Sequence, residues 1–291
     1  MYQVRTDLAL ETKEKFEEDN VEIKGVRINE EVKGENIKVT EVIIETENGA
    51  KAMGKPRGSY ITIEAPEMAD GDEGYHREIS RELAKVLRTM IPTQKEELSI
   101  LVVGLGNREV TPDALGPRVV DNMLITRHVI REFGRYALGN EHSNSISSIV
   151  PGVMAQTGME SLEIVRGVIK ETNPDYIIAV DALAARSVKR LNRTIQITNT
   201  GINPGSGVGN HRHGLNQDSV GIPVIAIGIP TVVDAATIVN DAISGFYEEA
   251  DCTLNSFFVT PKDIDESIKR LSFTISEGLN IAFEKETCTN S

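Results

Sequence analysis

The feature that most constrains the fold lies after residue 98, where short, nearly continuous apolar segments alternate with segments of helical periodicity. Strands are predicted at 100–105, 176–183, 194–198 and 223–229, with a weaker one at 145–150, and helices at 117–133, 159–172, 232–244 and 262–283. Strands buried on both faces have continuous apolar sequences, and their alternation with helices is typical of a parallel sheet. The sequence therefore predicts an α/β fold of three layers, αβα, with a mainly parallel central sheet.

The N-terminal region has a different pattern. Alternating β-branched segments at 21–27, 37–45 and 59–64 are separated by turn-prone residues, which indicates antiparallel hairpins. Helical spacing from Tyr75 to Met90 predicts a helix that ends before the proline at position 92. Because no linker is long enough to divide the chain, we interpret these hairpins as an elaboration of one domain.

Charge and cysteine content exclude several classes of function. The chain has 31 Lys and Arg against 44 Asp and Glu, and its net charge of −13 disfavours direct nucleic-acid binding. Neither a membrane-spanning apolar segment nor a signal peptide is recognisable. Cys252 and Cys288 have no metal-ligand spacing, which suits a reducing compartment. We therefore expect a cytoplasmic protein without a membrane or nucleic-acid partner.

Two glycine-rich segments resemble nucleotide-binding loops only superficially. The segment 101–107, LVVGLGN, ends a predicted strand, but Glu109 occupies the position of the third glycine in a dinucleotide fingerprint. The segment 203–210, NPGSGVGN, lacks the Gly-Lys-Ser/Thr of a phosphate-binding loop, and we interpret it as a wall beside the site. No nucleotide cofactor is predicted.

The first candidate catalytic residue is Asp113. It lies between a predicted strand and a helix expected to begin at Pro117, with Gly116 as its cap. The positive end of that helix would favour the ionised carboxylate, as a general base requires. The alternative is that Asp113 only caps the helix.

The second candidate is Asp181, which follows the apolar segment 176–180 at the predicted carboxyl end of a strand. This edge is where α/β sheets bind ligands, and a charge there is costly unless it is exposed or paired. The alternatives are capping of the next helix and pairing with Arg186. Two carboxylates at one edge could share a water and divide the acid and base roles, because neighbouring like charges separate their pKa values.

His211 and His213 could in principle bind a metal ion. Their two-residue spacing in a polar loop is more typical of solvated side chains, so no metal site is predicted from them.

The sequence resembles the germination proteases of spore-forming bacteria over nearly its whole length. The matching segments are VVGLGN at 102–107, VTPDALGP at 110–117, IVPGVM at 149–154, VDALAARS at 180–187, PGSGVGN at 204–210 and GIPVIAIGIPTVVDA at 221–235. The resemblance implies an endopeptidase of the forespore or spore core that initiates degradation of small acid-soluble, DNA-binding spore proteins. It also implies a homotetramer and identifies Asp113 and Asp181 as the two essential aspartates.

The same resemblance implies a zymogen that removes its own N-terminus. Cleavage within VRTDLA, 4–9, would fall between Asp7 and Leu8, leaving 1–7 as a short propeptide and 8–291 as a single peptidase domain. Within it, 8–95 would be the hairpin elaboration and helix, and 96–291 the catalytic core. We expect an exposed terminal segment that can reach the active-site cleft.

A more distant likeness is to the hydrogenase-maturation peptidases, through the strand ending in Gly-x-Gly-Asn and the two acidic residues. It implies a similar αβα fold. That family binds nickel through two carboxylates and a histidine, so a metal-dependent maturation peptidase is the alternative function. A non-catalytic binding protein is a second alternative. We predict no cofactor, with a divalent metal ion as the open alternative.

Overall fold

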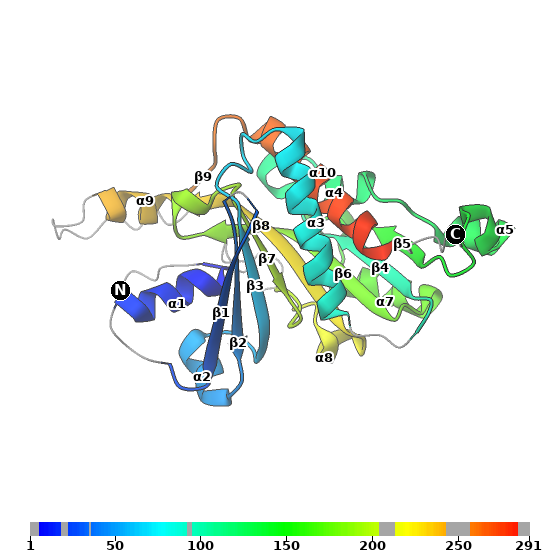
Figure 1. The fold of residues 1–291 in the computed structure, drawn as a ribbon, viewed down its shortest axis with the longest axis horizontal. Coiled ribbons are helices and arrows are strands. Elements are labelled where there is room, and N and C mark those ends of the chain that lie inside the picture. Colours follow the sequence, from blue (N-terminus) through cyan, green and yellow to red (C-terminus); the bar gives the residue numbers. More distant parts are fainter. Residues whose placement is uncertain are drawn as a thin grey trace.

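The computed structural model describes residues 6–18, 23–34, 36–91, 95–203, 213–242 and 257–284. Within these ranges the strands join in a single sheet in the order β1-β2-β3-β7-β8-β6-β4-β5, with β9 paired to β8 (Figure 1). The strands are β1 Val26–Lys33, β2 Ile37–Ile44, β3 Gly58–Glu64, β4 Ser99–Gly104, β5 Ser145–Ile149, β6 Tyr176–Ala185, β7 Thr194–Thr198, β8 Val224–Asp234 and β9 Phe258–Val259.

The helices surround this sheet. They are α1 Ala9–Glu18, α2 Glu47–Met53, α3 Glu73–Met90, α4 Leu115–Asp121, α5 Arg127–Phe133, α6 Met154–Thr157, α7 Ser161–Thr172, α8 Gln217–Val220, α9 Ala235–Ala242 and α10 Ile264–Phe283. The 3-10 turns are η1 Thr111–Asp113, η2 Arg135–Leu138 and η3 Val188–Arg190. No helix in the described ranges is long and apolar enough to cross a membrane.

The sheet has a parallel and an antiparallel half. Strands β8, β6, β4 and β5 are parallel, as the continuous apolar segments predicted. Strand β7 pairs antiparallel with β8 and with β3, so the N-terminal hairpins continue the same sheet. The prediction of an α/β fold with a parallel central sheet and N-terminal antiparallel hairpins is confirmed.

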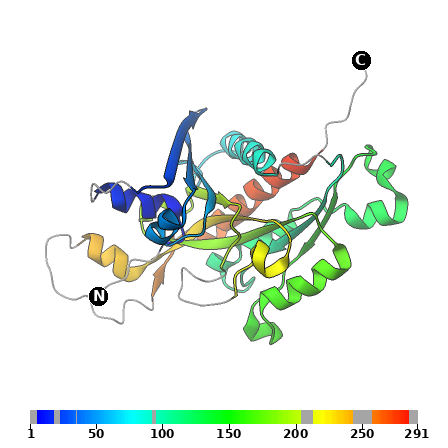
Figure 2. The ribbon, with the colours of Figure 1, turned by 90° about the horizontal axis from the view of Figure 1, so that it is seen from below.

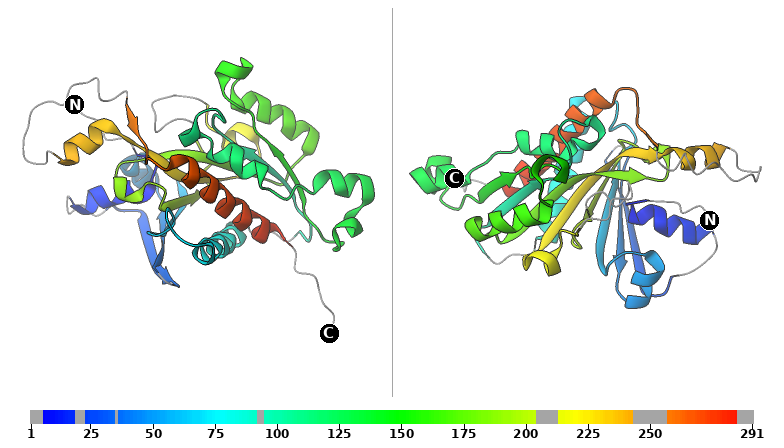
Figure 3. Two further views of the ribbon diagram at one scale, coloured as in Figure 1. Left: turned by 90° about the horizontal axis from the view of Figure 1, so that it is seen from above. Right: turned by 180° about the vertical axis from the view of Figure 1, so that it is seen from behind.

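The two faces of the sheet are covered differently. Helices α3, α10 and α4 pack on one face, where Ile100, Val102, Ile178 and Val180 belong to the largest apolar cluster (Figure 2). On the other face, α7 covers the parallel half through Leu162 and Val165, while α1 covers the antiparallel hairpins (Figure 3). Neither helix covers the stretch of sheet between α1 and α7, so a cavity can form there (Figure 3).

Several predicted boundaries are wrong for identifiable reasons. The helix expected at 117–133 is two helices, because the intervening backbone is held by neighbours: Leu124 N donates to Asn280 Oδ1, and Thr126 N donates to Ile146 O. The helix expected at 232–244 begins only at Ala235, because β8 continues to Asp234 and pairs there with β9.

The first N-terminal strand, expected at 21–27, lies at Val26–Lys33, where it pairs with β2 along its whole length. The other boundaries differ less. The helix expected at 159–172 begins at Ser161 and is preceded by the short α6. The strand expected at 194–198 is β7. Cys252, Cys288, His211 and residues 204–210 lie outside the described ranges.

Candidate functional site

Asp181 lies in β6, just beyond the point where the neighbouring strand β4 ends. Strand β4 ends at Gly104, opposite Val180, so Asp181 is the first residue of β6 beyond the end of its neighbour. The strand expected at 176–183 continues to Ala185 alongside β8. The carboxylate is buried, with 5% of the residue exposed, and its Oδ1 accepts a hydrogen bond of 2.9 Å from Ala182 N.

Asp113 ends the 3-10 turn η1, directly before α4. Its Oδ2 accepts a hydrogen bond of 2.7 Å from Asn107 N, which ties it to the turn after β4. The helix begins at Leu115 with Ala114 as its N-cap, so the predicted start at Pro117 with Gly116 as cap is wrong.

The glycines of this region allow backbones to approach one another closely. A Cβ at Gly106, which has a φ of +113°, would lie 2.0 Å from Asp113 O. A Cβ at Gly116 would lie 2.4 Å from both Leu105 O and Val180 O. Because these positions lack side chains, the first turn of α4 packs against the end of β4 and against β6 beside Asp181. The glycine turn therefore holds Asp113 near the sheet edge.

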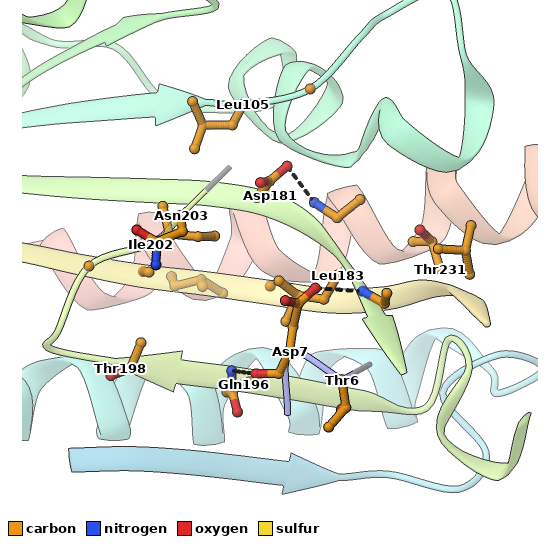
Figure 4. A pocket seen from close by; sticks show the side chains of 18 of the residues that line it. Thr6, Asp7, Leu105, Asp181, Leu183, Gln196, Thr198, Ile202, Asn203 and Thr231 are labelled. Atoms are coloured by element: carbon orange, nitrogen blue, oxygen red, sulfur yellow. Dashed lines mark hydrogen bonds between the residues drawn. The ribbon is translucent and has the colours of Figure 1, made fainter. Parts of the chain in front are cut away.

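Asp113 and Asp181 line one cavity of about 680 Å³. Figure 4 shows Asp181 among the residues that line it. Its walls come from the turn after β4, from β6, β7 and β8, and from the loop before β3, which contributes Lys55. The sequence prediction placed both carboxylates at one sheet edge, and the structure brings them into this one cavity.

The same cavity contains part of the N-terminus, because Thr6 and Asp7 line it. Asp7 pairs with Ala184 of β6 in both directions: Asp7 N donates to Ala184 O at 3.0 Å, and Ala184 N donates to Asp7 Oδ2 at 2.9 Å. Leu8 is completely buried against Leu183 and Val233. The expectation of an exposed terminal segment is therefore wrong at residues 6–9, which are docked on the sheet.

The carbonyl of Asp7 has two further partners. Gln196 Nε2 donates to Asp7 O at 3.0 Å, and Lys55 Nζ donates to the same oxygen at 2.8 Å. Burial lowers the pKa of Lys55 below its usual 10.5, although the charges of Asp7 and Glu11 act to raise it. These contacts hold the peptide bond between Asp7 and Leu8 in one orientation.

The docked bond and Asp181 lie on the same face of the sheet but over different strands. Gly228 of β8 is opposite both Asp181 of β6 and Gln196 of β7, so these residues form a row across the three strands. The side chain of Leu183 covers Gly228, and Figure 4 shows it between Asp181 and Asp7. Asp181 and Gln196 are therefore separated by two interstrand spacings, roughly 10 Å.

Glu11 anchors the start of α1 beside this cavity. Its carboxylate accepts hydrogen bonds from Arg186 N at 2.8 Å and Ser187 N at 3.0 Å, directly after β6. Arg190 forms ion pairs with Glu14, Glu64 and Glu11. The N-terminal helix is thus tied to the strand that carries Asp181.

His213 is an exposed residue whose Nδ1 lies 2.7 Å from Glu160 Oε2 at the start of α7. Among the residues described by the structure, no group of three or more His, Cys, Asp or Glu side chains is arranged to hold a metal ion.

Sequence reasoning did not identify Lys55 or Gln196. A signal existed for Gln196, because a polar residue in the apolar strand 194–198 must find a partner when both faces are covered. No comparable local signal exists for Lys55, whose partner is 48 residues away.

The fold and the site define an α/β protein with two carboxylates in a cavity that binds an extended peptide segment. The model of the germination protease family matches residues 4–249. The chain is 44% identical to the germination protease of Clostridium perfringens, over 98% of this chain and 96% of the relative. It is 45% identical to that of Caldanaerobacter subterraneus, over 97% of this chain and 94% of the relative. The chain belongs to the germination protease family and is a peptidase.

The chain is also similar to a relative from another genus and to one solved structure. The germination protease of Priestia megaterium is 49% identical over 83% of this chain and 66% of the relative. Among solved structures, the [NiFe] hydrogenase maturation protease HycI from Thermococcus kodakarensis matches with a TM-score of 0.34 and 19% identity, over 67% of this chain and 98% of that one.

Proposed function

We infer that this peptidase is an endopeptidase that cuts between an acidic and an apolar residue by means of Asp113 and Asp181. The observation that supports this most directly is that the chain's own Thr6 and Asp7 line the cavity into which both aspartates face. A peptide is thus bound beside two carboxylates, one of them buried.

In the proposed reaction, one carboxyl group acts as the base and the other as the acid. The ionised group takes a proton from a water molecule, whose oxygen attacks the carbonyl carbon of the peptide bond. When the C–N bond breaks, the protonated group gives its proton to the leaving nitrogen. We expect the pair to act without a resident metal ion.

The first substrate is the chain itself, cut between Asp7 and Leu8. In the resting structure this bond lies over β7, and Leu183 separates Asp7 from Asp181 (Figure 4). Cleavage therefore follows a movement of the segment towards Asp181, or insertion of the segment into the cavity of a second copy. The proposed homotetramer would supply such copies.

The protein substrates are the small acid-soluble spore proteins, degraded in the spore core at germination. They bind DNA and so present basic surface, which complements the net charge of −13 on this chain. Their cleavage sites are expected to present an acidic residue before the cut, as Asp7 does in this chain.

Asparagine substitutions test the catalytic pair. Purified wild-type protein is expected to lose residues 1–7, and intact-mass spectrometry reports the new N-terminus at Leu8. Asp113→Asn and Asp181→Asn are each expected to slow this cut by roughly a hundredfold or more, because a positioned acid or base contributes that much. The exposed Asp218 of α8 provides the matched control, Asp218→Asn. Equal rates in all four proteins would refute the assignment.

Removal of metal ions by a chelator distinguishes the proposed mechanism from that of a metal-dependent maturation peptidase. Protein dialysed against a strong chelator is expected to process itself and to cut an added small acid-soluble protein at an unchanged rate. Loss of activity that a divalent ion restores would favour the metal-dependent alternative.

A further inference from the structure

The side-chain amide of Gln196 spans the peptide bond between Asp7 and Leu8. Its Nε2 donates to Asp7 O at 3.0 Å, while its Oε1 accepts from Ala9 N at 2.7 Å. Only 7% of Gln196 is exposed. A buried amide satisfied on both sides by one peptide backbone holds that backbone in a fixed direction.

Asp7 itself occupies a small polar site. Both polar backbone atoms of Ala184 bond to it, one to its carboxylate and one to its N–H, and the ammonium of Lys55 contacts its carbonyl oxygen at 2.8 Å. Lys55 also lies close enough to the Asp7 carboxylate for the two charges to interact. A backbone N–H and a lysine together favour an acidic residue over a neutral one.

The residues on the two sides of the bond are held to different degrees. Asp7 is only half-buried, whereas Leu8 and Ala9 are fully buried, Leu8 beside Leu183 and Ala9 beside Val42. Loss of residues 1–7 would free Ala184, Lys55 and Nε2 of Gln196, whereas Oε1 of Gln196 would remain bonded to Ala9 N. An uncut substrate can place its acidic residue there once the new N-terminus at Leu8 moves aside.

We propose that Ala184, Lys55 and Gln196 form a subsite for an acidic residue, filled by Asp7 in the full-length chain and used after processing by the acidic residue of a protein substrate. Lys55 determines the preference for the acid, and Gln196 orients the backbone. The use of this subsite by substrates rests on the proposed function. Its occupation by Asp7 does not, because it depends only on the hydrogen bonds of the folded chain.

Peptide binding to the processed protein tests the role of Lys55. The probes are two acetylated hexapeptides that contain Thr-Asp-Leu-Ala or Thr-Asn-Leu-Ala. Titration calorimetry measures their affinities for two chains that carry Asp181→Asn and so do not cut them, one full-length and one that begins at Leu8. The processed protein is expected to prefer the aspartate peptide roughly tenfold, because the positive charge of Lys55 attracts the aspartate carboxylate and not the neutral asparagine. The full-length chain is expected to bind neither peptide, because Asp7 fills the subsite.

Substitutions of Lys55 distinguish the contribution of its positive charge from the contribution of its hydrogen bond. Lys55→Met is expected to abolish the tenfold preference and to weaken both peptides. Lys55→Gln retains a donor, so it should lose the preference but keep most of the affinity for the asparagine peptide. Lys51→Met, in the neighbouring helix α2 where Lys51 is exposed, is the matched control and should retain the preference. A preference that survives in Lys55→Met would overturn the assignment.

Hydrogen exchange tests the subsite without any cleavage. In the full-length chain, Asp7→Ala is expected to accelerate exchange at the amide of Ala184 by tenfold or more, because its acceptor is lost. Unchanged exchange there would refute occupation of the subsite by Asp7. If the chain never cuts after Asp7, the proposed function fails, and this measurement still decides whether the subsite exists.

Discussion

The two halves of the sheet contribute to the cavity in different ways. In the parallel half, Asp181 and the turn that holds Asp113 are placed by strand order and by glycines that let backbones meet. In the antiparallel half, the N-terminal segment is held by side chains that are distant in the sequence, chiefly Lys55, Gln196 and Arg190. The path of the backbone therefore fixes the part of the site in the parallel half. Polar contacts that can form and break hold the N-terminal segment in the antiparallel half.

This difference would suit the proposed self-processing. A carboxylate pair must keep its geometry before and after the cut, so rigid backbone packing suits it. A segment that leaves must be held by contacts whose loss does not unfold the protein, and polar anchors at one edge suit that role.

The largest expected effect tests the rigidity of the parallel half. Gly116→Ala should lower the free energy of unfolding by about 3 kcal/mol, because its Cβ would meet the carbonyls of Leu105 and Val180 at 2.4 Å. Urea denaturation measures the change. The matched control is Gly167→Ala on the exposed side of α7, where a Cβ has open space, and this change should stabilise by up to about 1 kcal/mol. Equal effects would mean that close packing at Gly116 is unimportant.

The next effect tests the polar anchors of the antiparallel half. The Arg190 side chain is only 11% exposed and pairs with Glu14, Glu64 and Glu11. Arg190→Met should cost about 2 kcal/mol, because it leaves the buried Glu11 without its cation. Proteolysis should then attack α1 before the sheet. Arg193→Met is the control: Arg193 is more exposed and pairs only at 3.4 Å with Asp70, so its loss should cost less than about 0.5 kcal/mol.

A smaller effect concerns the pH dependence of the acidic subsite. Burial lowers the pKa of Lys55 from 10.5, so its positive charge is present below that lowered pKa and is lost as pH rises through it. The preference of the processed protein for the aspartate over the asparagine peptide should therefore decline at a pH where an exposed lysine is still charged. Calorimetric titrations at increasing pH measure the decline. A preference that is constant up to the pKa of free lysine would contradict this role of Lys55.

The smallest effect is expected at Asp175, which lies far from the site, directly before β6, and serves as a control. Burial opposes ionisation of Asp175, but hydrogen bonds from Lys95 and Ser99 N outweigh it and lower its pKa below 3.8. A lowered carboxyl pKa contributes stability that is present above the unfolded value and is lost as pH falls through the folded one. Asp175→Asn should cost under about 1 kcal/mol at pH 7, and this cost should vanish in acid. Self-processing should not change.

The sequence predicted the parallel half well because its signals are local. Continuous apolar strands require burial on both faces. Asp113 follows such a strand and Asp181 interrupts one, and a charged side chain at such a position is costly unless it is exposed or paired. The errors in this half are boundaries. The predicted helix 117–133 breaks because Leu124 and Thr126 bond to partners outside it.

The antiparallel half could be predicted only in outline. Its hairpins follow from alternation and turn residues, and Asp7 and Leu8 were identified by resemblance to the germination proteases. Nothing local indicated that residues 6–9 would be docked rather than exposed, because their partners Gln196 and Lys55 are 189 and 48 residues away from Asp7.

The sequence by itself therefore determined the α/β class, the family and the two candidate catalytic aspartates, since these depend on patterns within short segments. The tertiary structure alone decided that both aspartates share a cavity with Asp7, and that Lys55, Gln196 and Ala184 hold that residue. The physical reason is that hydrogen bonds between segments far apart in the chain form only after the strands have been brought into order, and no local pattern encodes them.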